Sequence, residues 1–186
     1  MGRKQMGGDW SANAHSLFKE HGIKQVAYVP DAGLSGIIKA SLADNDIQTV
    51  PLTTEEEGVA VAAGAWLGGQ KCAVMMQSSG VGNTINMIAS LTTTCAFPLF
   101  MIVTMRGDYG ESNPWQMPMG RAVEPVLEAV GVRCLRADTA EDAADAIQAG
   151  LMMSFHGGEA VAVLISQKLI GAKAFAAPAA QDATGD

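Results

Sequence analysis

Six short apolar segments, separated by stretches with helical periodicity, are the feature that most constrains the fold of this chain. Most of them lack a regular alternation of apolar and polar residues, which is typical of strands buried on both faces of a sheet. The segments are Val26–Val29, Ile47–Val50, Ala73–Met76, Leu99–Thr104, Val132–Leu135 and Ala160–Ile165. Their composition predicts a six-stranded, mostly parallel sheet.

Two of the intervening stretches carry an apolar stripe with the spacing of one helix face. The first stripe is Leu34, Ile37, Ile38 and Leu42, and the second is Ala140, Ala144, Ile147 and Leu151. Thr139 directly precedes the second stripe and suits a helix N-cap, because its hydroxyl can accept a hydrogen bond from the first turn. Strands that alternate with helices in this way predict a single doubly wound α/β domain with helices flanking the sheet.

Composition sets the limits of this domain. The chain has 186 residues, of which 48% are hydrophobic and 17% are charged, so we exclude intrinsic disorder for its body. Residues 172–186 are small and polar and include a proline, and we expect them to form a loose tail. We expect a flexible N-terminus over residues 1–9 and the folded domain over residues 10–171.

The charge and the cysteines exclude several classes of partner. Twelve Lys and Arg against nineteen Asp and Glu give a net charge of −7, without a basic stripe for nucleic acid or for an anionic membrane surface. No apolar run approaches the roughly eighteen residues of a membrane span. The three cysteines (Cys72, Cys95 and Cys134) are far apart and form no CxxC motif, so we expect neither zinc nor disulfides. We therefore predict a cytoplasmic protein.

Polar segments follow several of the predicted strands, at the edge where open α/β sheets bind ligands. The longest irregular segment, Met105–Pro118, follows the fourth strand and is a candidate functional loop. Arg106 enters this loop directly from the strand, and its guanidinium could bind a carboxylate, sulfonate or phosphonate through two hydrogen bonds. The alternative is an ion pair of Arg106 with Asp108 or Glu111 at the surface.

Three consecutive glutamates, Glu55, Glu56 and Glu57, stand where the second strand gives way to a helix. A structural explanation is a capping box, in which Thr54 is the N-cap and Glu57 closes the first turn. One carboxylate is enough for this box, and neighbouring carboxylates repel each other. A second glutamate therefore also suggests a functional role.

The segment Gln77–Asn83 is a glycine-rich connection before a helix expected to begin near Thr84, and its N–H groups could approach an anion or a flat ring. It is not a dinucleotide fingerprint, because Ile85 occupies the position of the third glycine, and it matches neither a P-loop nor a nucleophile elbow. A plain tight turn is the alternative. Asp31, after the first strand, is expected to cap the next helix, although it too lies at the ligand edge.

Together these residues resemble the pyrimidine-binding domain of thiamine-diphosphate enzymes over about residues 10–170. The family places a Glu nine residues before a Gly in a helix of small residues, and Glu55 and Gly64 have this spacing. The Gln77–Asn83 segment and the loop that begins at Arg106 resemble the phosphonopyruvate and sulfopyruvate decarboxylase branch. The segment Gln116–Gly120 is most similar to the alpha subunits of sulfopyruvate decarboxylases.

This resemblance implies a carbon–carbon lyase that decarboxylates a 2-oxo acid, with 3-sulfopyruvate giving sulfoacetaldehyde and CO₂. Glu55 is the implied catalytic residue, because it would hydrogen-bond the pyrimidine nitrogen N1′ of thiamine diphosphate and favour the imino tautomer that activates this cofactor. The implied cofactor-binding residues are Glu55, Ser79, Gly80, Gly82 and Asn83, and the substrate-side residues are Asp31, Arg106 and Gln116. Phosphonopyruvate or another small 2-oxo acid is the alternative substrate.

The chain departs from the complete enzymes of this family in one respect. They hold the diphosphate and Mg²⁺ with a Gly-Asp-Gly motif followed by a distant Asn, whereas Asp9 and Asp108 here lack the second glycine. We therefore expect no metal ligand in this chain. We expect instead a hetero-oligomer, itself self-associating, in which a beta subunit holds Mg²⁺ and shares the cofactor. The remaining alternative is a non-catalytic nucleotide-binding or regulatory α/β subunit.

Overall fold

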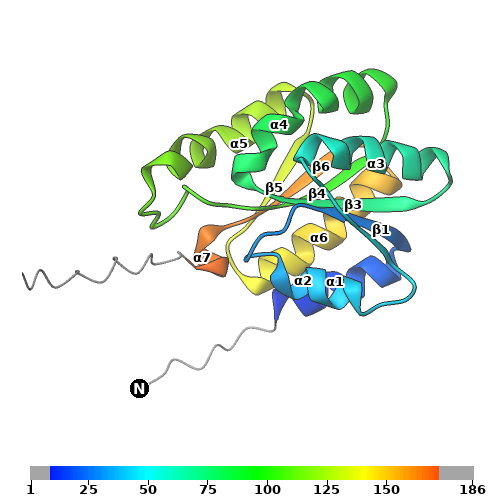
Figure 1. The fold of residues 1–186 in the computed structure, drawn as a ribbon, viewed down its shortest axis with the longest axis horizontal. Helices are drawn as coiled ribbons and strands as arrows, with labels where there is room; N and C mark the ends of the chain where they lie inside the picture. Colours follow the sequence, from blue (N-terminus) through cyan, green and yellow to red (C-terminus); the bar gives the residue numbers. More distant parts are fainter. Residues whose placement is uncertain (1–8, 172–186) are drawn as a thin grey trace, which may run out of the picture.

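The computed structural model describes residues 9–171, which form a six-stranded sheet with helices on both faces (Figure 1). Every strand pair is parallel, and the strand order is β2-β1-β3-β4-β6-β5. The strands are β1 (Ile23–Tyr28), β2 (Gln48–Pro51), β3 (Lys71–Gln77), β4 (Leu99–Thr104), β5 (Arg133–Ala137) and β6 (Ala160–Ile165). The prediction of a doubly wound α/β fold with a six-stranded sheet is confirmed.

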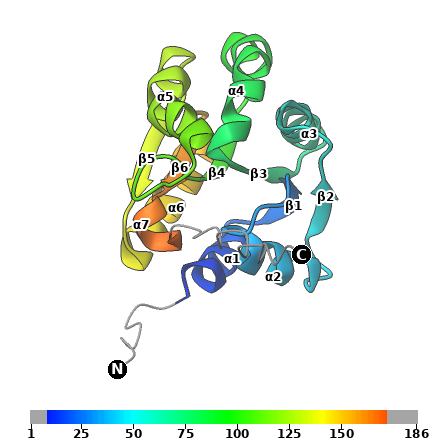
Figure 2. The ribbon, with the colours of Figure 1, turned by 60° about the vertical axis from the view of Figure 1, so that its left-hand side comes forward.

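The helices form one layer on each side of the sheet. Helices α3, α4 and α5 cover one face, and α1, α2 and α6 cover the other (Figure 2). The helices are α1 (Trp10–Glu20), α2 (Ser35–Leu42), α3 (Glu55–Leu67), α4 (Ser78–Met87), α5 (Met117–Ala129), α6 (Ala140–Phe155) and α7 (Gln167–Ile170). A π-helical turn (Ile88–Thr93) continues α4, and a 3-10 turn (Pro114–Gln116) leads into α5.

Each face of the sheet buries its own apolar core, because successive side chains of a strand point to opposite faces. On β3, Val74 and Met76 belong to the core beneath α3, α4 and α5, whereas Ala73 and Met75 belong to the core beneath α1, α2 and α6. Strands β4 and β6 are buried along their whole length, which explains their continuous apolar sequences.

The first predicted helical stripe is buried apart from its last member. Leu34, Ile37 and Ile38 lie in the core, but Leu42 is 58% exposed, so its assignment to the core is wrong. Leu42 is the last residue of helix α2, and five residues connect it to the start of β2 at Gln48. Thr139 is the N-cap of α6 as expected, and its hydroxyl accepts a hydrogen bond from the first turn.

Two expected boundaries near the carboxyl edge of the sheet are wrong. Helix α4 begins at Ser78 rather than near Thr84, so the glycine-rich segment is the start of a helix and not a turn. Gln77 is its N-cap in an extended conformation, and the glycines that follow keep negative φ angles compatible with a helix. The loop after β4 is also shorter than expected, because the 3-10 turn begins at Pro114.

The strand order reverses between β1 and β3, which are neighbours although β2 separates them in the sequence. In doubly wound sheets the ligand crevice lies beside such a reversal, at the carboxyl ends of the strands. Because all six strands are parallel, the connections that follow β1, β2, β3 and β4 leave the sheet at one edge. This edge is therefore where a functional site is expected.

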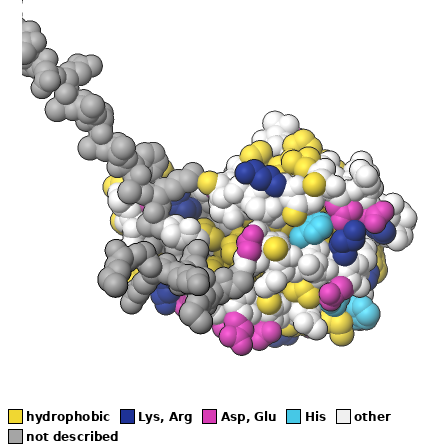
Figure 3. Space-filling view, turned by 90° about the horizontal axis from the view of Figure 1, so that it is seen from below, with side chains coloured by type: hydrophobic (Ala, Val, Ile, Leu, Met, Phe, Trp, Pro, Cys, Tyr) yellow, Lys and Arg dark blue, Asp and Glu magenta, His cyan; other side chains and the backbone are white. Residues whose placement is uncertain are grey.

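The expected flexible N-terminus and the expected tail fall, apart from Asp9, on residues 1–8 and 172–186, which lie outside the described residues. Within residues 9–171, no helix is both long enough and apolar enough to cross a membrane. On the face seen from below, acidic and basic side chains are interspersed with apolar ones and do not gather by sign (Figure 3).

Candidate active site

The carboxyl edge of the sheet brings together residues that are distant in the sequence. Asp31 follows β1, Glu55 follows β2, and Arg106 follows β4. Ser79, Gly80, Gly82 and Asn83 occupy the first turns of α4, directly after β3. These positions come from four separate connections, and the parallel strands place them on one side of the molecule.

Glu55 faces α4. It is the first residue of α3, and its Oε2 accepts a hydrogen bond from Asn83 Nδ2 at 2.8 Å. Gly80 lies against the same carboxylate, because a Cβ built on this glycine would overlap the Glu55 side chain. The absence of a side chain at Gly80 therefore allows the carboxylate to reach α4. Gly82 is less constrained, since a Cβ there would touch only Met119 at ordinary contact distance.

The three consecutive glutamates have different surroundings. Glu57 Oε2 accepts hydrogen bonds from the N–H groups of Thr53 (2.8 Å) and Thr54 (3.5 Å), which forms the expected capping box. Glu56 Oε2 is buried and has no hydrogen-bond partner within residues 9–171. Of the three, Glu55 is the one that contacts α4.

The surroundings of Glu55 fit the pyrimidine ring of thiamine diphosphate. One carboxylate oxygen is held by Asn83, and the other, Oε1, receives no hydrogen bond from the described part of the chain. A free carboxylate oxygen can bind a protonated ring nitrogen. Ser79 and Gly82 are exposed beside it on α4.

Asp31 does not cap a helix, so that expectation is wrong. Helix α2 begins only at Ser35, and its N-cap makes no side-chain hydrogen bond. The carboxylate of Asp31 is used elsewhere: its Oδ2 accepts from the N–H of Gly33 (2.8 Å) and from Thr104 Oγ1 (2.9 Å). Its Oδ1 accepts from Gln77 Nε2 at 2.8 Å. Asp31 is thus held between the ends of three neighbouring strands.

Two residues of this network, Gln77 and Thr104, are absent from the site predicted from sequence. Gln77 bonds Asp31 and also accepts hydrogen bonds from Ser79 Oγ (3.0 Å) and Gln116 Nε2 (3.2 Å). Each of the two is the last residue of a buried strand. A polar residue that ends an apolar strand at the ligand edge is the signal that could have identified them.

Arg106 forms an ion pair with Glu111, one of the two partners considered from sequence, but the pair is buried rather than at the surface. Nε and Nη2 of Arg106 donate to the two oxygens of Glu111 at 2.6 and 3.0 Å. The side chains are only 9% and 2% exposed. The hydrogen bonds from Arg106 lower the pKa of Glu111 to about 2, from an ordinary value of 4.5. Asp108 pairs instead with Arg136.

Gln167, at the start of α7, connects this ion pair to the loop and is a further residue that the sequence did not reveal. Its Nε2 donates to Glu111 Oε2 at 2.9 Å. Its Oε1 accepts from the N–H groups of Gly107 and Tyr109, both at 3.2 Å. Gln167 therefore links the loop after β4 to α7, the helix that follows β6.

Asp31 and Arg106 border the same small pocket at the carboxyl edge. Its volume is about 90 Å³, and Gly33 and Ile170 also line it. Two residues of opposite charge thus line one cavity, where they could orient a small polar ligand. The guanidinium is held in place by Glu111, so its position does not depend on a bound ligand.

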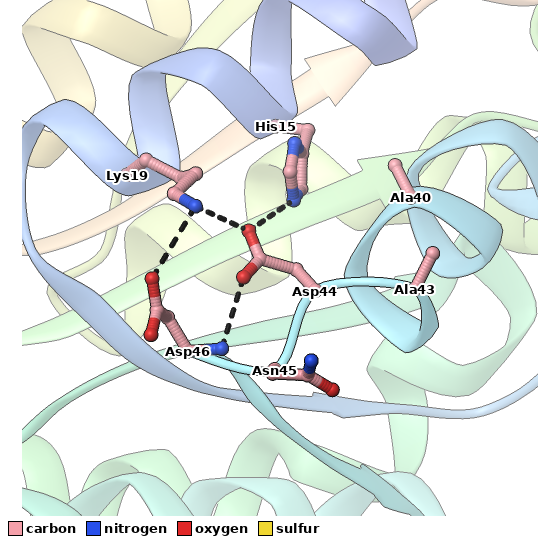
Figure 4. Close-up of a pocket in the computed structure, with 7 residues that line it drawn as sticks. All are labelled: His15, Lys19, Ala40, Ala43, Asp44, Asn45 and Asp46. Atoms are coloured by element: carbon pink, nitrogen blue, oxygen red, sulfur yellow. Dashed lines mark hydrogen bonds and ion pairs between the residues drawn. The ribbon is translucent and has the colours of Figure 1, made fainter.

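A second, larger pocket lies between α1 and the connection from α2 to β2 (Figure 4). Asp44 accepts there from Lys19 Nζ at 2.8 Å and lies 3.2 Å from His15 Nε2, and the bond from Lys19 lowers the pKa of Asp44. These side chains contact one another and join α1 to the connection before β2. We assign this cluster a structural role.

A metal centre is not assembled by residues 9–171, where no group of three or more His, Cys, Asp or Glu side chains is placed to hold an ion. Two groups of residues make up the candidate site. The first is the Glu55–Asn83 pair against Gly80, and the second is the network of Asp31, Gln77 and Arg106.

Comparison with known proteins defines the class to which this site belongs. Residues 14–124 match the family described as thiamine pyrophosphate enzyme, N-terminal TPP binding domain. The chain belongs to this family, which its sequence was found to resemble. A solved structure of 2-oxoglutarate:ferredoxin oxidoreductase from Magnetococcus marinus has the same fold, with a TM-score of 0.70 over 87% of this chain and 29% of that one, at 14% identity.

Within the family, the chain is similar to proteins named sulfopyruvate decarboxylase subunit alpha. It is 38% identical to the one from Methanococcus maripaludis, over 83% of this chain and 93% of that protein. It is 40% identical to the one from Methanocaldococcus jannaschii, over 69% of this chain and 76% of that protein. It is also 38% identical to phosphonopyruvate decarboxylase from Streptomyces viridochromogenes, over 58% of this chain and 27% of that protein.

Proposed function

We propose that this chain is the alpha subunit of a two-subunit, thiamine-diphosphate-dependent decarboxylase that converts 3-sulfopyruvate to sulfoacetaldehyde and CO₂. The observation that carries the proposal is the carboxylate of Glu55, which Asn83 holds at 2.8 Å while one of its oxygens stays free. Similarity to the alpha subunits over nearly their whole length supports the choice of reaction.

Glu55 would hold a proton at the pyrimidine nitrogen of the cofactor. When bound, thiamine diphosphate accepts the electron pair released as CO₂ leaves the substrate. The chain's own contribution is to position this carboxylate through Asn83 and Gly80 and to offer the exposed surface of Ser79 and Gly82 to the ring. Position and proton control are what the protein adds to the chemistry of the cofactor.

The pocket between Asp31 and Arg106 would receive the substrate. Arg106 is our choice for the sulfonate, because a guanidinium suits an oxyanion with several acceptor oxygens. Asp31 and Gln116 would orient the rest of the molecule, and the small volume of the pocket favours a short acid. A phosphonate resembles a sulfonate in shape, so phosphonopyruvate is the second candidate substrate, supported by the similarity to phosphonopyruvate decarboxylase.

The active enzyme would need a beta subunit. The names of the relatives, which describe them as alpha subunits, support a partner chain. We propose that this partner holds the diphosphate and Mg²⁺, and that the catalytic centre lies between the two chains. Exposure of Ser79, Gly82 and Asn83 is consistent with a partner that covers this edge.

The test is to purify the chain together with a candidate beta subunit and to supply thiamine diphosphate, Mg²⁺ and one 2-oxo acid at a time. We expect the highest kcat/KM with 3-sulfopyruvate, and formation of sulfoacetaldehyde and CO₂ in equal amounts. Preference for phosphonopyruvate would establish the second candidate. No decarboxylation of any 2-oxo acid by a complex that binds the cofactor would overturn the proposal.

Gly80→Ala is expected to preserve the fold but to impair Glu55. Ala is favoured over Gly inside a helix by about 0.5–1 kcal/mol, which offsets part of the cost of moving Glu55, so the chain should stay folded. The new methyl group would displace the carboxylate of Glu55, whose flexible side chain can rotate away. We expect kcat to fall by about 10- to 100-fold, measured beside thermal unfolding.

Gly64→Ala is the matched control for this substitution, because no atom lies within 4 Å of a Cβ at Gly64 and the residue is also helical. Gly64→Ala should raise the free energy of unfolding by about 0.5–1 kcal/mol, the helix preference of Ala over Gly, and leave kcat unchanged. A Gly80→Ala enzyme with unchanged kcat would show that the observed placement of Glu55 is unimportant.

Arg106→Lys is expected to raise the KM for 3-sulfopyruvate by about 10-fold or more, although the positive charge remains. The guanidinium of Arg106 binds both oxygens of Glu111 in parallel, which fixes its position. The ammonium group of a lysine cannot bind in this way, so the positive charge would no longer be held at the same place. Arg133→Lys is the control, because Arg133 pairs with Glu159 at the surface and is 56% exposed. An unchanged KM in Arg106→Lys would remove Arg106 from the substrate site.

A further inference from the structure

We infer that Gln77 is a positioning residue for the substrate side of this site, holding Asp31, Ser79 and Gln116 through a single amide group. The inference deepens the proposed function and rests on it. Every group in this network belongs to the chain itself, so the network forms without any contact to a cofactor or a metal.

Gln77 stands at the centre of the site because of its place in the fold. It is the last residue of β3, the strand beside the reversal of the sheet, and it is also the N-cap of α4. Its side chain therefore leaves the sheet where the connections after β1 and β4 converge. Asp31 and Gln116, which it bonds, are 46 and 39 residues away in the sequence.

The network requires a side chain that donates and accepts at the same time. An ionised Asp31 can only accept, and Gln77 Nε2 supplies a donor at 2.8 Å. Ser79 Oγ and Gln116 Nε2 both donate, and Gln77 Oε1 accepts from them at 3.0 and 3.2 Å. A primary amide meets both demands, and these partners determine which end of the amide faces Asp31.

The consequence for the site is a carboxylate with a fixed orientation. Gln77 holds Oδ1 of Asp31, while Gly33 N and Thr104 Oγ1 hold Oδ2. Asp31 is thereby fixed beside the pocket that it shares with Arg106. Without Gln77, Oδ1 of Asp31 would lose its donor, and only Gly33 N and Thr104 Oγ1 would still orient the carboxylate beside the pocket. We therefore expect Gln77 to control substrate affinity more than the chemical step.

The decisive variant is Gln77→Glu, which keeps the size of the side chain but places a second carboxyl group against Asp31. Two carboxylates at hydrogen-bond distance cannot both ionise freely, so the pair retains a proton to a higher pH than either group alone. The other charged groups at this edge are Arg106, which Glu111 already binds, and Glu55, which bonds Asn83. At low pH the shared proton restores the hydrogen bond, and at high pH the contact becomes repulsive.

Two measurements on the complex with the beta subunit follow. The KM for 3-sulfopyruvate should be close to the wild-type value near pH 5.5 and about 10-fold higher near pH 8, with a smaller change in kcat. Without substrate, the loss of melting temperature caused by Gln77→Glu should grow as the pH rises. In this variant the pKa of the carboxyl pair that the new side chain forms with Asp31 should be higher in the folded than in the unfolded chain. The variant should therefore lose stability as the pH rises and the shared proton leaves.

Two further variants separate this role from general damage. Gln70→Glu makes the same chemical change at an exposed residue, which accepts a hydrogen bond from Gln25 at 2.7 Å, and should show neither effect. Thr104→Val removes a donor to the other oxygen of Asp31 and should raise the KM by a similar factor without the pH dependence.

The inference would be overturned if the loss of melting temperature in Gln77→Glu did not grow with pH more than that in Gln70→Glu. This outcome counts whether or not the complex is active. An unchanged KM across this pH range would overturn it as well. An inactive wild-type complex would contradict the proposed function, and the melting measurement would still decide whether Gln77 and Asp31 interact as inferred.

Discussion

Replacing Glu55 with Gln is expected to lower the rate of decarboxylation by about 10²- to 10⁴-fold, the range typical of a lost general acid–base group. The amide of Gln cannot hold and return a proton at a ring nitrogen as a carboxylate does. The side chain keeps its size and an oxygen that can accept from Asn83, so α3 and α4 should pack as before. The measurement is kcat of the complex, with assembly checked by gel filtration.

Glu57→Gln is the matched control, because it makes the same change two residues away on the same helix. Glu57 closes the capping box, and an amide oxygen can still accept from the N–H groups of Thr53 and Thr54. We expect near-normal activity and a loss of about 1 kcal/mol or less in stability. If Glu55→Gln retained wild-type activity, a non-catalytic role for the chain would be favoured.

Replacing Glu111 with Ala is expected to reduce the free energy of unfolding by about 3–5 kcal/mol, the cost of removing one partner from a buried ion pair. The substitution leaves the guanidinium of Arg106, only 9% exposed, without its counter-charge. It also removes the acceptor for Gln167 Nε2 and for the N–H groups of Ser112 and Asn113. Denaturant unfolding of the purified chain would measure this loss.

The control for this prediction is Glu159→Ala. Glu159 also pairs with an arginine, Arg133, at 2.8 Å, but both side chains are largely in solvent. Exposed pairs contribute about 1 kcal/mol or less, so the loss should be small. Equal losses in the two variants would show that the pair of Arg106 and Glu111 is not buried in solution.

The same ion pair predicts a dependence of stability on pH. The pKa of Glu111 is about 2 in the folded chain, below its ordinary value of 4.5, because Arg106 stabilises the ionised form. Glu111 therefore contributes its full stabilisation above about pH 4.5 and loses it as the pH falls toward 2. The melting temperature of Glu111→Gln should change less over this interval than that of the wild type.

Local sequence determined the fold class and the approximate position of every strand of the sheet. A strand buried on both faces is a short, continuous apolar run, and this property does not depend on what the strand pairs with. The motifs that carry the resemblance to the family, including Glu55 and Gly64 on one helix, are local as well, and the resemblance implied Glu55 as the principal catalytic candidate. The capping roles of Thr54, Glu57 and Thr139 could be predicted for the same reason.

The tertiary structure alone decided how the other side chains are used. Asp31 suited a helix cap in its local sequence, but Gln77 and Thr104, 46 and 73 residues away, bind its carboxylate instead. A surface ion pair was the alternative expected for Arg106, but its pair with Glu111 is buried, and Gln167 on α7, 56 residues from Glu111, donates a hydrogen bond to it. Hydrogen-bond partners so far apart are brought together by the order of the strands, and local sequence patterns do not specify that order.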